Sequence, residues 1–363
     1  MINRLVVENL KHRPVRTLLT ISAVGLQVTM ILTLVGLSEG TLKDIQTRTR
    51  GIGADVMIRP PNSSAIGLSS APMSEKMVAK MAQLPHVALA TSSIEQSTDL
   101  FARYTGVNFD EYNRMAEFRF VAGGMPKNDD EIIIDEYYAK QHNVHVGDTF
   151  NVINTNWKIA GIFEPGKGAR IFLPMRAVQE KTSNTGKISI IYLKADRPEN
   201  AQLVKTEAKQ LLGPTYPIYT IEEFASLLSV DQVPLLKPFT HVVIGLSIVF
   251  GFLVVFLSMY TAVLERTREI GILKALGASP VYILTILLRE TAVLGIVGSI
   301  AGIILTYGTR AVITKFPASL TQIIVYDWWP IASGIALVAA LLGAVYPGLK
   351  AARQDAIEAL TYE

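Results

Sequence analysis

The amino-terminal part of the chain contains the uncharged run TLLTISAVGLQVTMILTLVGL at residues 17–37. At a rise of about 1.5 Å per residue, a helix of this length crosses a hydrocarbon core of about 30 Å. Three further uncharged, apolar runs follow at residues 242–264, 291–309 and 328–347. Buried helices of soluble proteins seldom stay apolar for more than about fourteen residues. We therefore predict four membrane-spanning helices, placed at 17–38, 242–264, about 286–309 and 328–347.

The composition of the chain supports a membrane protein and excludes several kinds of functional site. Half of the 363 residues are hydrophobic, the net charge is only +3, and there is no cysteine. The lack of cysteine excludes disulfides, thiolate metal sites and cysteine nucleophiles. The small net charge argues against nucleic acid as a partner. A cleaved signal peptide is the alternative for the first run, but no small-residue cleavage site follows Leu37, so an uncleaved anchor is favoured.

The distribution of basic residues predicts the orientation of the spans. Short loops rich in lysine and arginine remain in the cytoplasm. Residues 1–16 read as a cytoplasmic amphipathic helix and 348–363 as a cytoplasmic tail, so both termini are expected inside the cell and residues 39–238 outside. The only short loop on the outer side holds two basic residues, Arg310 and Lys315, and the predicted cytoplasmic side holds nine: Arg4, Lys11, Arg13, Arg16, Arg266, Arg268, Lys274, Lys350 and Arg353.

Residues 39–238 are polar enough to fold in water and predict an α+β domain. Its beginning reads as strand, helix and strand at 55–59, 74–84 and 87–93, and its end repeats this order at 187–194, 201–212 and 218–220. Two such units predict a split βαβ arrangement, with a β-rich insertion at about 100–185. The expected fold class is thus an α-helical membrane protein with one span before and three spans after an extracytoplasmic α+β domain.

Catalytic and metal-binding motifs are not apparent in this domain. His142 and His145 lie three residues apart, but no third ligand is spaced nearby, so an exposed pair is favoured over a metal site. The stretch Pro165-Gly166-Lys167-Gly168 lacks the first glycine and the final hydroxyl residue of a phosphate loop. The acidic cluster at 129–131 is typical of a solvated turn. We therefore predict no catalytic residue, no metal site and no cofactor on this chain.

The strongest functional signal is the stretch ERTREIGILKALGAS at residues 265–279, between the second and third spans. Its charged start and its apolar stripe of Ile270, Leu273 and Leu276 predict a short amphipathic helix. Gly277 suits the position after the helix, and Ser279-Pro280 suits the start of the next one. Such a helix can dock on a partner protein or lie on lipid as a hairpin, and the pattern alone does not decide between the two.

The same stretch resembles the signature loop of the FtsX-like permeases, the MacB-type class of ABC transporter membrane subunits. The tail YPGLKAARQDAIEAL at 346–360 is similar to the ending of that family, and NLKHRPVRTLLT at 9–20 is similar to its start. The stretch VHVGDTFNVINTNWKIAGIF at 144–163 resembles the periplasmic core domain of the family. Ala356 departs from the pattern, where many relatives have proline. The resemblance divides the chain into a MacB-like periplasmic core domain within 39–238 and an FtsX-like permease domain at 239–363.

This resemblance implies a membrane subunit without enzymatic activity in the cytoplasmic (inner) membrane. Two permease chains, identical or different, are expected to assemble with two ABC ATPase subunits, which bind ATP and Mg²⁺, because no phosphate-loop motif occurs in this chain. A periplasmic adaptor protein and membrane lipid are further expected partners. Residues 265–279 match the coupling helix of the family, so the expected ATPase-coupling residues are Glu265, Arg266, Arg268, Glu269, Ile270, Leu273, Lys274, Leu276 and Gly277.

The leading functional hypothesis is mechanotransmission, in which motion of the ATPase is relayed through the spans to the outer domain. Gln27 is the only strongly polar residue of the first span. One charge pair, Arg289-Glu290, lies near the third span at its cytoplasmic end, and it is interpreted as an anchor at the interface. The first hypothesis for the activity that this motion drives is export of a drug, peptide or lipid-like molecule. Extraction of lipoproteins or lipids, and non-transport signalling of the cell-division type, are the two alternatives.

Overall fold

The computed structural model describes residues 14–61, 63, 72–97, 103–233, 236–313 and 320–354. Residues 1–13 of the predicted amphipathic helix at 1–16, and residues 355–363 of the predicted tail, lie outside this range, and residues 14–16 form the start of the first long helix. The chain divides into two compact units. The first, here called the membrane unit, comprises residues 1–38, 235–313 and 322–363, and the second, here called the globular domain, comprises 39–234 and 314–321.

Four long helices account for the four predicted spans, since each predicted run falls within one of them. Each is long and apolar enough to cross a membrane. The last helix continues beyond the predicted end of the fourth span, passing through Pro347 to Arg353. The helices are α2 (Pro14–Arg50), α9 (Leu236–Glu265), α11 (Pro280–Ile313) and α12 (Trp328–Arg353), and a short helix, α10 (Thr267–Ala275), lies between α9 and α11.

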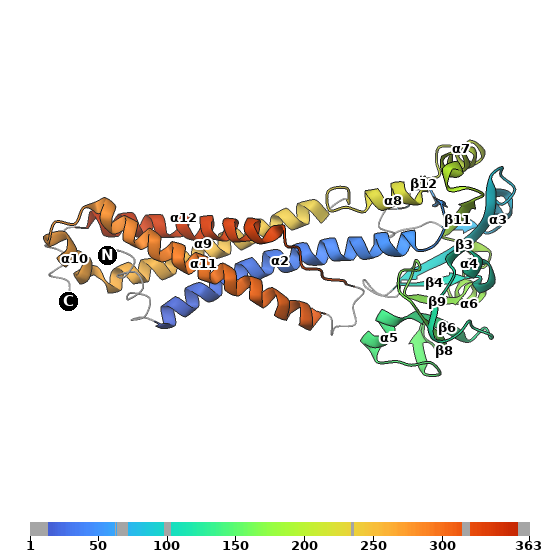
Figure 1. Cartoon of the computed structure of the whole chain (residues 1–363), viewed down its shortest axis with the longest axis horizontal. Coiled ribbons are helices and arrows are strands. Elements are labelled where there is room, and N and C mark those ends of the chain that lie inside the picture. The colour runs from blue at the N-terminus through green and yellow to red at the C-terminus, as the bar shows by residue number, and fades with distance from the viewer. Residues whose placement is uncertain are drawn as a thin grey trace. The chain divides into compact units, whose positions relative to one another are not determined.

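Small residues allow the helices of the membrane unit to pack closely, and Figure 1 shows α9, α11 and α12 running alongside one another. Three alanines spaced four residues apart on α12, Ala336, Ala340 and Ala344, are fully buried and form a packing surface. On α11, a Cβ atom added at Gly302 would lie only 2.5 Å from the carbonyl oxygen of Gly25. Only a residue without a side chain fits there, so the backbones of α2 and α11 touch, as is usual where small residues meet in membranes.

The globular domain is built on one mixed sheet with the strand order β12-β1-β11-β3-β4-β9-β6-β8-β5, and β7 pairs with β8. Its first half is formed by β1 (Val56–Ile58), β3 (Val87–Ser97), β11 (Ile190–Ala195) and β12 (Ile218–Thr220). Its second half is formed by β4 (Arg103–Val107), β5 (Phe120–Gly123), β6 (Glu131–Asp135), β7 (Thr149–Val152), β8 (Thr155–Phe163) and β9 (Ile171–Pro174). Strands β2 (Met73–Ser74) and β10 (Lys187–Ile188) form a separate pair.

The predicted split βαβ units are confirmed by the strand order. Strand β11 lies antiparallel between β1 and β3, and β1 lies antiparallel between β11 and β12. The two units therefore interleave in one sheet. The predicted insertion does not form a sheet of its own, because β4 pairs with β3 and, in parallel, with β9. The strand-rich segment thus continues the same sheet.

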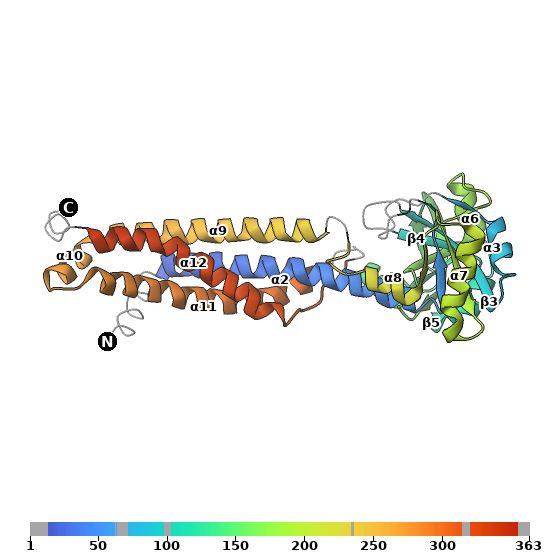
Figure 2. The same ribbon diagram turned by 90° about the horizontal axis from the view of Figure 1, so that it is seen from above.

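Side chains alternate between the two faces of the sheet, so each face carries its own helices. Val56 and Ile58 of β1 belong to a core that also contains Met81 and Val204, from α3 (Lys76–Met81) and α7 (Ala201–Leu212). On the other face, Tyr192 contacts Tyr112 of α4 (Phe109–Ala116), with ring centroids 6.2 Å apart. Figure 2 shows α3, α6 and α7 gathered over the strands. The remaining helices are α5 (Glu136–His142), α6 (Met175–Lys181), α8 (Ile221–Leu227) and the 3-10 helix η1 (Pro198–Asn200).

Candidate functional site

The candidate functional site is α10 with the residues that hold it at the end of the membrane unit. Helix α9 ends at Glu265, the chain turns at Arg266, and α10 begins at Thr267. The predicted cap at Gly277 is confirmed, because its φ angle of 91° lies in the left-handed region that glycine adopts readily. The amide of Gly277 donates to the carbonyl of Lys274 and that of Ala278 to Leu273, which is the hydrogen-bond pattern of a Schellman motif.

The next helix begins as the sequence predicts. The hydroxyl of Ser279 accepts a hydrogen bond of 3.2 Å from the amide of Tyr282, and Pro280 is the first residue of α11. Proline is favoured at this position because its missing N–H has no partner in the first turn of a helix. Helix α10 is therefore closed at its end by a glycine cap and followed at once by a capped span.

Helix α10 has one face packed in the bundle and one face exposed. Thr267 and Ile270 are buried, and Ile270 belongs to the apolar core of the bundle. The other face carries exposed Arg268, Glu269 and Ile272, and Leu276 beyond the helix end is 81% exposed. This exposed surface, residues 268, 269, 272 and 276, is hereafter called the α10 face. It mixes charged and apolar side chains, as surfaces that bind other proteins do.

The structure places the nine predicted coupling residues in different surroundings. Arg268, Glu269 and Leu276 lie on the α10 face, whereas Arg266 and Ile270 lie inside the bundle. Ile272, which is 45% exposed, belongs to the α10 face and was missed by the sequence analysis, although its spacing of four from residue 268 indicates the same face. Of the other four, Glu265 and Gly277 are exposed and Leu273 and Lys274 are half-buried.

A buried ion cluster lies where α10 begins, and sequence analysis did not predict its composition. Glu290 of α11 is fully buried, and its carboxylate binds two guanidinium groups. Its Oε1 atom lies 2.5 Å from Nη2 of Arg16 on α2, and its Oε2 atom lies 3.0 Å from Nη1 of Arg266. The interpretation of Arg289-Glu290 as an anchoring pair at the interface is wrong for Glu290, because Arg289 points outward and Glu290 points into the bundle. A carboxylate buried among apolar helices needs such cationic partners.

The other end of α10 is held by the last span. The ammonium group of Lys274 donates a hydrogen bond to the backbone carbonyl of Gln354, directly after α12. Ala351 and Ala352 of α12 are buried in the same apolar core as Ile270. Helix α10 is therefore fixed at its beginning by Glu290 and along its length by the end of α12.

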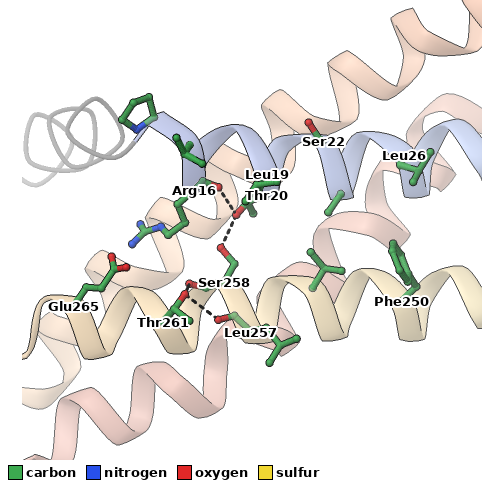
Figure 3. Close-up of a pocket in the computed structure, with 14 residues that line it drawn as sticks. Arg16, Leu19, Thr20, Ser22, Leu26, Phe250, Leu257, Ser258, Thr261 and Glu265 are labelled. Carbon is green, nitrogen blue, oxygen red and sulfur yellow. Dashed lines mark hydrogen bonds between the residues drawn. The ribbon is translucent and has the colours of Figure 1, made fainter.

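A lateral groove of about 780 Å³ separates α2 and α9 near the ion cluster, as Figure 3 shows. Its walls are mainly apolar and include Leu19, Leu26, Phe250 and Leu257. At one end of the groove the Arg16 side chain extends from α2 toward α9, whose last turn carries Glu265. Nearby, the hydroxyl groups of Thr20 and Ser258 form a hydrogen bond of 2.6 Å. The groove thus combines a long apolar surface with a polar end.

The globular domain contains its own buried ion cluster around Arg170. The guanidinium group donates to Asp135 at 3.1 Å and to Asp44 in the last turns of α2 at 2.9 Å, and it lies over the ring of Tyr137. It also donates to the hydroxyl of Thr321 at 3.3 Å. Burial raises the pKa of Asp135 to about 6, although Arg170 and the amide of Tyr138 favour its charged form. This cluster joins four separate segments of the chain and is structural in character.

The side chains considered for chemistry in the globular domain have structural contacts. His142 stacks on Tyr138 with ring centroids 4.1 Å apart, and burial lowers its pKa. The backbone amide of His145 donates to the carboxylate of Asp148. Lys167 donates to the carbonyl of Ala116. Among the residues that the structure describes, no group of three or more histidine, aspartate or glutamate side chains is arranged to hold a metal ion.

Comparison with protein families assigns both units of the chain. The description "FtsX-like permease C-terminal" matches residues 241–356, and "MacB-like periplasmic core domain" matches residues 17–211, more than half of the chain. The chain belongs to the FtsX-like, MacB-type family of ABC transporter permeases. This MacB-type permease thus consists of four apolar helices and a domain of the extracytoplasmic kind.

Individual relatives agree with this assignment. The permease is 28% identical over 226 residues to the ABC transporter permease YknZ of Bacillus subtilis, covering 60% of this chain and 55% of YknZ. It is 25% identical over 388 residues to the macrolide export ATP-binding/permease protein MacB of Photorhabdus laumondii, covering 96% of this chain and 58% of MacB. The chain therefore spans a little over half the length of these relatives. The solved periplasmic region of MacB from Actinobacillus actinomycetemcomitans matches with a TM-score of 0.39 and 15% identity, covering 49% of this chain and 94% of that one.

Proposed function

We propose that this permease receives ATP-driven motion from a separate ABC ATPase at α10 and relays it to the extracytoplasmic domain, for the export of a drug, peptide or lipid-like molecule. The observation that carries the proposal is the α10 face. It is exposed, it belongs to a short capped helix between two spans, and its opposite side is fixed in the bundle.

The composition of the α10 face favours a protein partner over lipid as its contact. Arg268 and Glu269 are exposed beside Ile272 and Leu276, so opposite charges stand next to apolar side chains. Interfaces between proteins commonly have an apolar centre and a charged rim, and a helix can present both in one groove. A helix lying on lipid is expected to keep its charges on the side away from its apolar residues.

The anchoring of α10 favours force relay over a passive hairpin. Its beginning contacts Glu290 through Arg266, and Lys274 near its end contacts Gln354 after α12. A displacement of α10 therefore acts on several spans at once. Among the charged residues of the described spans, Glu290 is the most deeply buried, and each of its carboxylate oxygens forms an ion pair with an arginine. This arrangement supports the relay of motion through the helices rather than a polar channel through the bundle.

The proposed assembly follows from this role. The α10 face lies in the cytoplasm, where the ATPase binds ATP and Mg²⁺, and both termini lie on the same side of the inner membrane. A second permease chain completes the membrane part, and an adaptor protein outside the membrane is a further proposed partner. This chain contributes binding and transmission and no hydrolysis.

Extraction of lipids or lipoproteins is a second candidate function, and the lateral groove favours it. A groove of about 780 Å³ with apolar walls and a polar end fits an amphiphilic molecule that leaves the bilayer sideways. Export and extraction share the same ATPase and the same α10 face. Co-purification of the complex with mass spectrometry of bound proteins and lipids distinguishes them: an adaptor supports export, and stoichiometric lipid or lipoprotein supports extraction.

The proposed ATPase contact is tested by charge and polarity changes on the α10 face. Leu276→Asp and Glu269→Lys alter exposed side chains, so correct folding is expected, whereas binding of the ATPase should fall at least about tenfold, as for interface hot spots. Arg310→Glu, an exposed charge reversal at the other end of α11, is the matched control and should bind normally. Unchanged ATPase binding by both α10 variants in correctly inserted protein contradicts the proposal.

A further inference from the structure

Glu290 of α11 links its own helix to α10, the helix before it, and to α2, near the beginning of the chain. Its two carboxylate oxygens bind separate arginines, Arg16 at the start of α2 and Arg266 at the start of α10. Arg16 lies 274 residues away in sequence and Arg266 lies 24 residues away. Because Glu290 is fully buried and its partners are 12% and 7% exposed at the side chain, water competes little for these contacts.

The contact between Glu290 and Arg16 matters because α2, which carries Arg16, contributes residues to both compact units. The boundary between the two compact units falls inside α2, between Ser38 and Glu39. Within the described residues, α2 is the only helix that contributes to both units, since α9, α11 and α12 belong wholly to the membrane unit. Its last turns in turn carry Asp44, which binds Arg170 in the globular domain.

We propose that Glu290 is the positioning residue that passes the displacement of α10 directly to α2. This inference rests on the proposed function, because it names the side chain through which the proposed relay runs. When α10 is pushed at the α10 face, Arg266 moves with it, the shared carboxylate follows, and Arg16 pulls the start of α2. The covalent route through α9 and α11 remains, but it does not include α2.

The geometry supports a relay over simple charge neutralisation. One arginine is enough to neutralise one carboxylate, yet Glu290 binds two, one on each oxygen and each from a different element. Hydrogen-bonded ion pairs whose partners are both largely buried are short and directional. A small displacement of one partner is therefore expected to displace the other. Helix α2 also approaches α11 closely where Gly25 meets Gly302, so the two helices are in contact at that point as well.

The relay is tested with Glu290→Gln in the complete complex with its ATPase in lipid nanodiscs. Glutamine keeps the size and one acceptor oxygen but removes the charge that holds two guanidinium groups. Because the chain lacks cysteine, one environment-sensitive fluorophore at Lys209→Cys, an exposed position on α7, reports on the extracytoplasmic domain. The matched control is Thr291→Val, which alters a neighbouring buried side chain whose hydroxyl bonds only to Leu287 of its own helix in the described contacts.

The expected result is a selective loss of response. Glu290→Gln should bind the ATPase within twofold of the parent chain, whereas the ATP-dependent fluorescence change at residue 209 should fall at least about fivefold, the lower range of typical coupling between sites. Thr291→Val should retain the response. If Glu290→Gln does not fold, Arg16→Gln, which leaves the pair of Glu290 and Arg266 intact, should show the same selective loss.

Two other outcomes separate the relay from the proposed function. A normal ATP-dependent response in a folded Glu290→Gln or Arg16→Gln complex overturns the relay through Glu290. Failure of the parent chain to bind any ATPase overturns the proposed function itself. A loss of response in Thr291→Val equal to that in Glu290→Gln also overturns the relay, because it shows that any disturbance of the buried bundle has the same effect.

Discussion

Replacing Gly302 with alanine tests the packing of α2 on α11. Alanine is the better helix former, by up to about 1 kcal/mol in a helix interior. The added Cβ atom, however, lies 2.5 Å from the carbonyl oxygen of Gly25 and 2.8 Å from the Cβ atom of Val28. Neither neighbour is the end of a flexible side chain, so the two helices must move apart.

The size of the effect follows from three contributions. Overpacking of this kind typically costs about 1–3 kcal/mol. The hydroxyl of Thr29 donates to the carbonyl of Gly302 at 3.0 Å, and loss of such a bond between membrane helices costs about 0.6 kcal/mol. The gain in helix propensity offsets up to about 1 kcal/mol. We therefore expect Gly302→Ala to lower the free energy of unfolding by about 1–3 kcal/mol, since the clash outweighs propensity.

The control is Gly308→Ala on the same helix, where a Cβ atom has no heavy atom within 4 Å. This change should be neutral or slightly stabilising, so the two substitutions are expected to have opposite signs. The assay is reversible unfolding of the full-length chain in mixed detergent micelles with a fluorescence readout. Equal stability of the two variants, or greater stability of Gly302→Ala, refutes the close contact between α2 and α11.

Three further predictions concern caps and charges. Gly277→Ala should fray the end of α10 at a cost of about 1–2 kcal/mol, because φ is 91° there, and faster amide hydrogen exchange at that end is the measurement. Arg170→Gln should destabilise the globular domain to urea by about 3–5 kcal/mol, because it leaves Asp135 buried without its cation, whereas exposed Arg176→Gln should not. Desolvation on its own raises the pKa of Glu223, but hydrogen bonds from Lys205, Thr220 and Gln202 lower it to about 2. The stabilisation is therefore present above pH 4.5 and lost as the pH falls toward 2, so the stability difference between parent and Glu223→Gln, measured by urea unfolding, should shrink over that range.

Features set by local sequence were predicted well. The four spans follow from uninterrupted apolar runs, and the cap at Gly277 follows from a glycine directly after an amphipathic stretch. The split βαβ units follow from alternation of strand and helix patterns. The continuity of the sheet was not predictable, because the parallel pairing of β4 with β9 joins segments about 65 residues apart and no local pattern specifies that register.

The candidate site was predicted in position but not in its internal contacts. The pattern at 265–279 predicts a helix, and the spacing of Ile270, Leu273 and Leu276 predicts a single apolar stripe on it. In the structure, however, Ile270 is buried and Leu276 is exposed. The bundle covers α10 from one side only, and that direction depends on packing between distant helices. A carboxylate within a span signals that a partner is needed. Which arginine supplies it depends on how α2 packs, and this is not encoded near Glu290.

The most direct test of the central claim is photo-cross-linking from α10 in living cells. A photoreactive amino acid is placed at residue 276, which is 81% exposed on the α10 face, and as a control at residue 326, which is 62% exposed and lies beyond the other end of α11. The account predicts an adduct from residue 276 that contains an ABC ATPase, and none from residue 326. The absence of an ATPase adduct from residue 276, or equal adducts from both positions, contradicts it.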